Sequence, residues 1–419
     1  MRVLHVSTHA RQGGAAIAAF RQHAALREIG VDSTMLVRFK ESNDPSIKLI
    51  SPSTSPIARL SRGIRRHKIA KSKQRTLTNS HQAFIEFSSC AGDILGNEIK
   101  SQLLNFDVVN IHHVTPSIDL TSLLLNVPKN VPIVLTMHDM NPFTGGCHYS
   151  NGCVRFQQQC GECPLLASGE KTTQVEHARK RSVYATIGES RLHFVAISNW
   201  QYDAANTASL TQYGKTSLIH HGIDSSVFNA TGRESAKSAL GWDERPIIMF
   251  GAAQSTSARK GLTILSDALK RMKGSAYRIV TFGDREPEMI SDFEHEHFRS
   301  IGNESLLAVL YRAADVFVAP SREEAFGLTA LEATACGALI VVSQGTGLED
   351  IVEHGANGFA ASVDDPDSFA KAIDACISNQ EMKESWAKSC EQFIESKFAS
   401  RLNADKYLEL YKQAVAEID

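Results

Sequence analysis

The feature that most constrains this chain is a strand, a loop, a helix and a second strand encoded within residues 314–342. Residues 314–320 form a short apolar run that a proline stops, and residues 338–342 form a β-branched run entered through a glycine. Between them, residues 328–336 contain strong helix formers with apolar side chains at helical spacing. The pattern predicts a βαβ unit, and therefore an α/β fold with parallel strands.

Two carboxylates lie near the start of this predicted helix, Glu324 in the loop and Glu332 within the helix. The free N–H groups of Phe326, Gly327 and Leu328 at the helix N-terminus favour an anion such as phosphate. One carboxylate can then hold a hydroxylated ring and the other a ribose, with phosphate between them. The alternative is a plain βαβ unit in which Glu324 is solvated and Glu332 pairs with a nearby cation.

The segment EAFGLTALE at 324–332, with residues 311–321 before it and ATACG at 333–337 after it, resembles the signature of family 4 retaining glycosyltransferases. The resemblance implies that Glu324 contacts a donor sugar and Glu332 the ribose of its nucleotide. It also implies the GT-B fold, with two Rossmann-like domains whose mostly parallel sheets face a central cleft. The family usually has glycine where this chain has Ala325.

Length and composition agree with two soluble α/β domains. The chain has 419 residues, of which 42% are hydrophobic and 21% charged, values typical of globular proteins. No apolar run approaches the ~20 residues that a membrane-spanning helix needs. Residues 1–7 are interpreted as a buried strand rather than a signal peptide. We therefore expect a cytoplasmic protein.

Residues 59–75 carry a run of arginines and lysines without an acid, although the formal net charge of the chain is only −2. One interpretation is a solvated helix or mobile loop. The other is a patch that rests on anionic lipid, where each cation contributes about 1 kcal/mol, and this would place the protein on the inner membrane face. No aromatic residues interleave the charges, which argues against nucleic acid.

Gly13 and Gly14 follow the strand at residues 3–7 and open a helix that runs to about residue 29. Glycines at such a turn let the backbone approach a phosphate, and the helix N-terminus favours its charge. The resemblance implies that this loop lies against the donor phosphates and the acceptor. Because the dinucleotide fingerprint with three glycines is absent, an NAD enzyme is disfavoured.

Residues 106–113 and 131–139 predict two further parallel strands, each followed by histidine. Ligands of open α/β sheets bind outside the carboxyl ends of the strands. A histidine in such a place is more often structural, but the family resemblance implies that His138 meets the donor sugar near its reacting carbon. We therefore predict that His138 is catalytic and that Asp139 orients it.

An insertion at residues 143–164 holds four of the eight cysteines: Cys147, Cys153, Cys160 and Cys163. A reducing compartment disfavours disulfides, and the C-x-x-C spacing of the last pair is typical of half a zinc site. A structural zinc would order the insertion, and the alternative is four free thiols. Residues 137–148 also resemble a subgroup of these transferases from bacterial exopolysaccharide and O-antigen pathways.

Arg259 and Lys260 precede a second predicted helix, and this position suits a diphosphate clamp. The alternative is two exposed surface cations. Family members commonly carry another arginine five or six residues before the lysine, where this chain has Gln254 and Ser255. Gly302 lies, by resemblance, where the backbone holds the nucleotide base.

These observations predict a domain at residues 1–228, a second domain at 229–399, and a last helix at 400–419 that returns to the first. The resemblance implies transfer of a hexose-type sugar from a UDP or GDP donor to a hydroxyl of a lipid-linked oligosaccharide, or a similar acceptor, in surface polysaccharide biosynthesis. No DxD-type metal motif is recognised at the end of a predicted strand, so no catalytic metal is expected. The alternatives are a GT-B nucleotide-sugar epimerase and a non-catalytic nucleotide-sugar binding protein.

Overall fold

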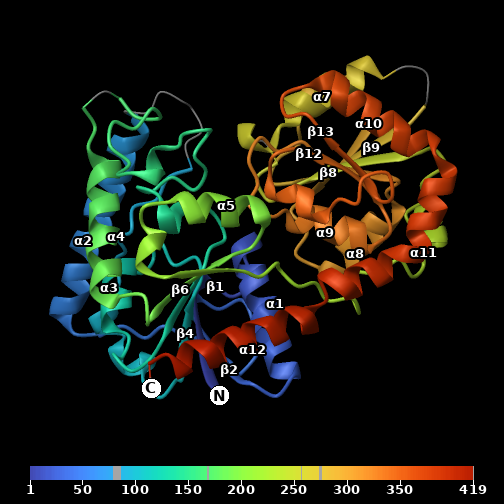
Figure 1. Ribbon diagram of the computed structural model, residues 1–419. Helices are drawn as coiled ribbons and strands as arrows, with labels where there is room; N and C mark the ends of the chain where they lie inside the picture. The colour runs from blue at the N-terminus through green and yellow to red at the C-terminus, as the bar shows by residue number, and fades with distance from the viewer. Residues whose placement is uncertain (79–85, 168, 256, 273–275, 419) are drawn as a thin grey trace. The chain divides into compact units, whose positions relative to one another are not determined.

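A computed structural model describes residues 1–78, 86–167, 169–255, 257–272 and 276–418. The chain divides into two compact units (Figure 1): unit 1 is Met1–His220 with Asn403–Asp419, and unit 2 is His221–Leu402. The first boundary thus lies eight residues before the predicted one at 228/229, and the return to unit 1 begins at 403 rather than 400.

The described part of unit 1 contains a seven-stranded sheet in the order β3-β2-β1-β4-β5-β6-β7. Every pairing in it is parallel. The central strands β4, β5 and β6 are buried along their whole length, as expected for a parallel sheet covered on both faces. The strands are β1 (Arg2–His9), β2 (Asp32–Phe39), β3 (Ile47–Leu49), β4 (Val108–Ile111), β5 (Ile133–Thr136), β6 (Leu192–Ala196) and β7 (Lys215–Leu218).

Helices cover both faces of this sheet. Alternate residues of a strand point to opposite faces, and accordingly Val109 belongs to one core cluster and Val108 to another. Residues of α3, α4 and α5 pack in the first cluster, and those of α1 and α12 in the second. The helices are α1 (Gly14–Glu28), α2 (Pro56–Thr78), α3 (Leu120–Asn126), α4 (Thr172–Ile187), α5 (Asn199–Thr207) and α12 (Ser400–Ala416).

The last helix, α12, completes the core of unit 1 beside α1 (Figure 1). The Tyr411 hydroxyl accepts hydrogen bonds from Gln22 Nε2 at 2.9 Å and Asn110 Nδ2 at 2.7 Å. The Tyr407 hydroxyl lies 3.2 Å from Thr136 Oγ1. Buried tyrosine hydroxyls need such partners, so the end of the chain is joined to three separate elements near its beginning.

The described part of unit 2 contains a six-stranded sheet in the order β10-β9-β8-β11-β12-β13, again with parallel pairings only. Its strands are β8 (Ile247–Gly251), β9 (Arg278–Gly283), β10 (His295–Arg299), β11 (Val316–Ala319), β12 (Leu339–Ser343) and β13 (Gly358–Ala361). Its helices are α6 (Arg233–Ala239), α7 (Leu262–Arg271), α8 (Glu304–Ala313), α9 (Leu328–Ala335), α10 (Pro366–Ser378) and α11 (Gln380–Lys397).

The sequence explains the helices next to the candidate site. In α7, Leu262, Leu265 and Leu269 are buried at helical spacing and the last turn is basic, which suits the negative end of the helix dipole. The side chain of Asn303 caps α8 by accepting from the N–H of Leu306 at 3.1 Å. The start of α8 is therefore fixed by its cap, and α7 is held by its buried face.

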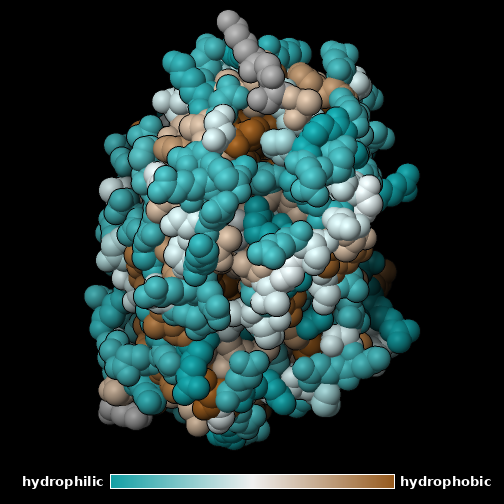
Figure 2. All heavy atoms as spheres, turned by 90° about the vertical axis from the view of Figure 1, so that its right-hand side faces the viewer, coloured by the Kyte–Doolittle hydropathy of each residue, from teal (hydrophilic) through white to brown (hydrophobic). Residues whose placement is uncertain are grey.

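In the described part of the chain, none of the helices has both the length and the apolar character required to cross a membrane. The face drawn in Figure 2 is mainly hydrophilic, and hydrophobic residues are visible on it in small separate areas. The large apolar side chains lie mostly in the cores of the two units.

Candidate functional site

In unit 2, a close backbone approach joins the start of α7 to the loop after β11. Arg259 and Lys260 lie in the 3-10 turn η6 (Ala258–Lys260), which Gly261 ends with a φ of 70°. A Cβ on Gly261 would lie 1.8 Å from the carbonyl oxygen of Pro320, so only glycine fits there. The N–H of Arg322 also donates to the carbonyl of Arg259 at 2.8 Å.

This approach brings the predicted phosphate-binding cations to the predicted sugar-binding carboxylate. The Lys260 ammonium contacts Glu324 Oε2 directly. Arg259 donates to the carbonyl of Glu323 at 2.9 Å and lies 3.5 Å from Glu324 Oε2. Glu324 is only 9% exposed, so its negative charge is largely shielded from solvent and is paired with two cations.

The N-terminus of α9 lies in the same loop. Gly327 is the residue before the helix and has a φ of 99°, and Leu328 is the first helical residue. The ring of Phe326 is a core group, since it is 2% exposed and packs edge-on to His221 and Phe398 with centroid distances of 5.3 and 5.9 Å. Any contribution of Phe326 to ligand binding is therefore limited to its backbone.

Glu332 is buried within α9 and accepts a hydrogen bond from the hydroxyl of the fully buried Tyr311 at 3.1 Å. A carboxylate with this burial needs such a partner. Gly302 lies exposed between β10 and α8, where an added Cβ would meet no atom within 4 Å. Gly302 therefore lies in a different loop from Glu324, which follows β11.

In unit 1, three histidines form a chain from the middle of β1 to the ends of β4 and β5. His138 Nε2 lies 3.0 Å from Nδ1 of His112, and His112 Nε2 lies 2.9 Å from Nδ1 of His5. Burial lowers the pKa of His138 to about 4 and that of His5 well below its usual value. Neutral imidazoles donate at one nitrogen and accept at the other, so each ring in this chain constrains the tautomer of the next.

The structure pairs Asp139 with a residue other than His138. Its carboxylate accepts from His148 Nδ1 at 2.6 Å and from the N–H of Asn141 at 2.7 Å. Burial acts to raise the pKa of Asp139, but the neighbouring His148 and these hydrogen bonds hold it well below its usual range. Asp139 thus orients His148, while His112 is the hydrogen-bond partner seen at His138 Nε2.

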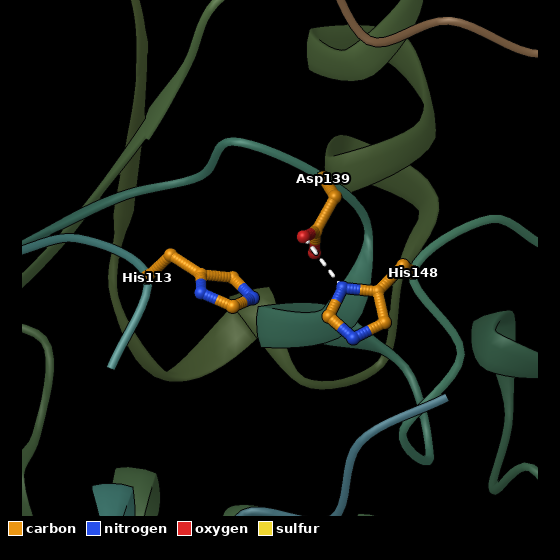
Figure 3. Close-up of side chains that lie close together, drawn as sticks. All are labelled: His113, Asp139 and His148. Atoms are coloured by element: carbon orange, nitrogen blue, oxygen red, sulfur yellow. Dashed lines mark hydrogen bonds and ion pairs between the residues drawn. The ribbon is translucent and has the colours of Figure 1, made fainter. Parts of the chain in front are cut away.

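His113 completes a group of three possible metal ligands with Asp139 and His148. One ligand atom from each lies within 4.8 Å of the others. Figure 3 shows the three side chains converging on one space, with the Asp139–His148 hydrogen bond dashed. Sequence reasoning gave His113 and His148 no role, because they are far apart along the chain and neither belongs to a metal-binding motif.

A cavity of about 30 Å³ lies at these strand ends, a volume that admits a water-sized group. Apolar side chains and Pro142 share its lining with polar side chains. Its lining includes His112, His113, His138, Asp139 and Asn141.

The four cysteines of the insertion line a second cavity, of about 20 Å³. The N–H of Gly145 donates to Cys160 Sγ at 3.2 Å. Burial raises the pKa of Cys147 to about 12 and that of Cys160 to about 11, and neighbouring thiols add to both shifts. The four sulfurs are less closely spaced than the His113 group, which is the only set of three within 4.8 Å among the described residues.

Lys180 of α4 supports the base of this insertion and was not singled out by sequence reasoning. It is fully buried, and its ammonium donates to the carbonyl of Asn141 at 2.5 Å, to Asn141 Oδ1 at 3.2 Å and to the carbonyl of Thr144 at 3.1 Å. Its positive charge acts to lower the pKa values of Cys147 and Cys160. A buried cation beside a group of thiols favours their ionised form.

Gly13 has a φ of 88° and precedes α1, whose first residue is Gly14. A Cβ on Gly13 would meet no atom within 4 Å. The backbone angle, rather than crowding, therefore explains glycine at this position.

The basic run of residues 59–75 belongs to α2, and part of its charge is paired within unit 1. Arg62 donates to Glu98 at 2.5 Å, Arg65 also contacts Glu98, and Arg66 donates to Asp93 at 2.8 Å. These arginines therefore have a structural use. Arg75 lies outside the side chains that the structure describes.

The outer face of α2 combines apolar and basic side chains. Ile57, Leu60 and Ile64 are 79%, 68% and 49% exposed, and their spacing of three and four residues places them on one face. The remaining described cations of the run are exposed: Arg59, Lys68, Lys71 and Lys73.

Comparison with known proteins bears first on unit 2. Residues 232–393 match the family described as glycosyl transferases group 1. This range contains Arg259, Lys260, Gly302, Glu324 and Glu332. It does not reach the histidines or the cysteines of unit 1.

Curated relatives align with parts of the chain. A D-inositol 3-phosphate glycosyltransferase from Saccharomonospora viridis is 28% identical over 51% of this chain and 52% of its own length. An uncharacterized glycosyltransferase from Methanocaldococcus jannaschii is 35% identical over 28% of this chain and 30% of its own. The chain thus spans about half or less of these two relatives. A Mycobacterium ulcerans D-inositol 3-phosphate glycosyltransferase is 24% identical over 87% of this chain and 74% of its length.

Solved structures match the whole fold at low sequence identity. Sucrose-phosphate synthase from Thermosynechococcus elongatus has a TM-score of 0.68 at 18% identity, covering 99% of this chain and 100% of its own. WaaG, a glycosyltransferase involved in lipopolysaccharide biosynthesis, has a TM-score of 0.63 at 14% identity, with coverages of 98% and 99%. These matches confirm the predicted fold class. Residues 232–393 of unit 2 are therefore similar to the group 1 glycosyl transferases, and the chain as a whole has the GT-B fold with two Rossmann-like units.

Proposed function

We propose that this protein is a glycosyltransferase that moves a hexose-type sugar from a nucleotide diphosphate to a hydroxyl group. The observation that carries the proposal is the contact of Lys260 with Glu324, beside Arg259 and the N-terminus of α9. Cations and free backbone N–H groups suit a diphosphate, and a carboxylate suits sugar hydroxyls. The family match of unit 2 supports the same function.

In this proposal the rate of sugar transfer depends on how well the protein stabilises the negative charge of the leaving diphosphate. As the bond from the sugar to the diphosphate breaks, Lys260, Arg259 and the N–H groups at Gly327 and Leu328 stabilise the negative charge that develops. Glu324 then exchanges its contact with Lys260 for hydrogen bonds from sugar hydroxyls. The acceptor oxygen forms the new bond, and its proton leaves with the diphosphate or to water. We assign no metal ion to the diphosphate.

Glu332 is the proposed ribose ligand and Gly302 the proposed neighbour of the base. In unit 1, we assign His138 to the donor sugar and the loop at Gly13 and Gly14 to the donor phosphates and acceptor. Asp139 is retained as a supporting residue that acts through His148 rather than directly on His138. Retention of configuration rests on the resemblance of residues 324–332 alone.

UDP is the first donor nucleotide to test, because the structural neighbour Anabaena Alr3699/HepE, with a TM-score of 0.63 at 14% identity, was solved with UDP and glucose. GDP is the second. The decisive experiment is calorimetric titration of nucleotide diphosphates and their sugars into the wild-type protein and Lys260→Ala. We expect selective binding of one nucleotide that falls at least about tenfold in the variant, since it loses a charged contact.

A matched control for this titration is Lys270→Ala, which removes an exposed cation from the last turn of α7. Its nucleotide affinity should equal that of the wild type. If neither UDP, GDP nor any other nucleotide in the panel binds the wild type, the proposed function is wrong. Release of free nucleotide only when an acceptor is present would separate a transferase from an epimerase and from a binding protein.

We propose a lipid-linked oligosaccharide at an anionic membrane surface as the acceptor, in O-antigen or exopolysaccharide biosynthesis. The support is the exposed face of α2, where Ile57, Leu60 and Ile64 accompany exposed cations. Apolar side chains beside basic ones are typical of helices that lie in the membrane interface. Arg62, Arg65 and Arg66 are better excluded from this role because they bind Glu98 and Asp93.

We also propose a structural zinc bound by Cys147, Cys153, Cys160 and Cys163. The fit rests on the cavity that all four line and on the buried ammonium of Lys180, which offsets thiolate charge. The thiols would have to move closer together around the ion, because zinc holds four sulfurs at about 2.3 Å. Bound zinc would supply a cross-link within the insertion and no open coordination position.

Elemental analysis of protein purified without chelators tests this assignment. We expect the zinc content to fall by about one ion per chain in Cys163→Ser. Cys376→Ala is the matched control, because Cys376 is a buried thiol of unit 2 outside the insertion, and it should keep the metal. Absence of zinc from the wild type would show that the cysteines are free thiols.

A further inference from the structure

We infer that His113, Asp139 and His148 form a second metal site, which binds a first-row divalent cation. They come from three segments: the end of the β4 region, the end of the β5 region and the cysteine-rich insertion. Two imidazoles and one carboxylate are the ligand set that such cations accept from proteins. Neither the group 1 family match, which covers 232–393, nor the proposed sugar transfer assigns this site.

The spacing of the three ligand atoms suits a single ion. They lie within 4.8 Å of one another, and ligands at about 2.0–2.2 Å from one tetrahedral ion are separated by about 3.3–3.6 Å, so small side-chain movements bring them to an ion. Figure 3 shows that both imidazoles and the carboxylate face the same space. An ion there would replace the 2.6 Å hydrogen bond between His148 Nδ1 and Asp139 Oδ2 with two bonds to the metal.

The surrounding hydrogen bonds fit metal ligation. If His148 binds through Nδ1, its Nε2 carries the proton and lies 3.0 Å from Ser88 Oγ, which can accept it. Metal-binding histidines characteristically donate their second nitrogen in this way. The N–H of Asn141 donates to Asp139 Oδ1 at 2.7 Å, so the other carboxylate oxygen is left to face the ion.

A simple hydrogen-bonded pair of Asp139 and His148 would explain only two of the three side chains. Among the described residues, no other side chain hydrogen-bonds the ring of His113, although it stacks near His148 with centroids 5.5 Å apart. Its presence in the group supplies a third ligand that the pair does not need. A metal ion accounts for all three.

The site differs in kind from the proposed zinc of the cysteines. Three protein ligands leave at least one coordination position open, as in catalytic rather than structural metal sites. His113 and Asp139 also line the 30 Å³ cavity that His138 lines. The open position therefore belongs to the polar end of the unit 1 sheet, where water or a ligand hydroxyl can enter.

The test is a titration of Co²⁺ into the full chain that carries one equivalent of zinc, which four cysteine thiolates bind in preference to two imidazoles and a carboxylate. Co²⁺ bound by imidazole and carboxylate gives visible absorption without the thiolate charge-transfer band that cysteine ligation adds. We expect one saturable Co²⁺ per chain with no thiolate band. In His113→Gln this binding should be lost while zinc content and circular dichroism stay unchanged.

His148→Gln should lose the same binding, and His354→Gln, which changes an exposed histidine of unit 2, should keep it. The inference is overturned if the wild type binds no saturable Co²⁺, if His113→Gln binds it equally well, or if all bound Co²⁺ shows the thiolate band. Because His113 holds no hydrogen bond to another described side chain, its variant tests the site even if His148→Gln fails to fold. Nucleotide binding is measured separately, so the two proposals can fail independently.

Discussion

The candidate groups of the two units are built in different ways. In unit 2, oppositely charged side chains and a helix N-terminus meet within two loops, with Glu324 against Lys260 and Arg259. In unit 1, imidazoles form hydrogen bonds with one another, as in the chain from His138 through His112 to His5. A separate group of thiols lines a small cavity there. The first arrangement suits a charged ligand that displaces internal contacts. The second suits proton placement and metal binding.

The difference also follows chain position. The unit 2 residues lie inside the range that matches the group 1 family, whereas those of unit 1 lie outside it. Glu324 and Glu332 belong to one βαβ unit, and a second loop, 64 residues from Glu324 in the chain, brings Lys260 to Glu324. The unit 1 group depends on segments that meet only after the whole sheet has formed, so it can differ between proteins that share the fold.

The largest effect should come from Glu324→Ala. If unit 2 supplies the donor-sugar contact, the variant should lower kcat/KM for transfer at least about 1,000-fold, or about 4 kcal/mol, while the protein stays folded. Steady-state nucleotide release is the measurement. Glu323→Ala is the neighbouring control, because Glu323 contributes its carbonyl to Arg259. Wild-type rates in Glu324→Ala would show that Glu324 does not contact the donor sugar. Unit 2 would then not supply the charged site on which the comparison depends.

The next effect concerns the face of α2 that is proposed to bind a membrane. Lys68→Gln, Lys71→Gln and Lys73→Gln together should weaken partitioning onto anionic vesicles about 100-fold, since each cation contributes about 1 kcal/mol. Sedimentation with vesicles measures this. The same change at Lys270, Lys371 and Lys388, which are exposed in unit 2, should have little effect. Equal losses of vesicle binding in both triple variants would indicate that the net charge of the protein, rather than the exposed face of α2, determines the binding.

Acid should destabilise unit 1 through its buried histidines. Burial, with the nearby Arg27, lowers the pKa of His23 to about 4. Because this folded-state pKa lies below the unfolded value of about 6.5, the stability is present above pH 6.5 and is lost as the pH falls toward 4. At pH 5 the loss is about 2 kcal/mol for this one group.

Thermal unfolding of the wild type and His23→Gln between pH 7 and 5 measures this effect. The wild type should lose more stability than the variant over that range, and His354→Gln in unit 2 should behave like the wild type. An identical pH dependence in His23→Gln would show that His23 is not the group responsible.

The smallest effect should be that of Glu332→Gln. The amide keeps one acceptor for the Tyr311 hydroxyl but removes the charge that is proposed to hold a ribose. We expect nucleotide affinity to fall about tenfold, or 1.4 kcal/mol. Calorimetry checks this, with Glu391→Gln as an exposed control on α11. No change would remove the ribose role from Glu332 and leave the rest of unit 2 unaffected.

Sequence reasoning was most successful where the relevant residues are neighbours in the chain. The strands on either side of residues 324–332, and the α/β class, follow from apolar periodicity, because parallel strands are buried on both faces. The short β3 carries little apolar signal, since Lys48 and Leu49 are exposed. β3 lies beside β2 because the two strands pair, and the sequence pattern alone does not identify that pairing.

The site of unit 1 was harder to predict because its contacts join distant segments. His138 and Asp139 were singled out, but Asp139 bonds to His148, and Ser88 lies at the other side of that ring. Proximity in sequence suggested that Asp139 orients His138, yet adjacent residues after a strand point in different directions. The arginines of α2 were likewise assigned to a free surface, since Asp93 and Glu98 follow only after the end of the helix.

The position of α12 has a consequence for how the protein is made. Tyr407 and Tyr411 fill the core of unit 1 and bond to residues of α1, β4 and β5. During synthesis these partners leave the ribosome long before α12 does, at about 5–20 residues per second. Until then Gln22 and Asn110 lack the hydroxyl that joins them. Unit 1 therefore begins first and is finished last, and a ribosome that stops before residue 403 releases a chain whose N-terminal unit is incomplete.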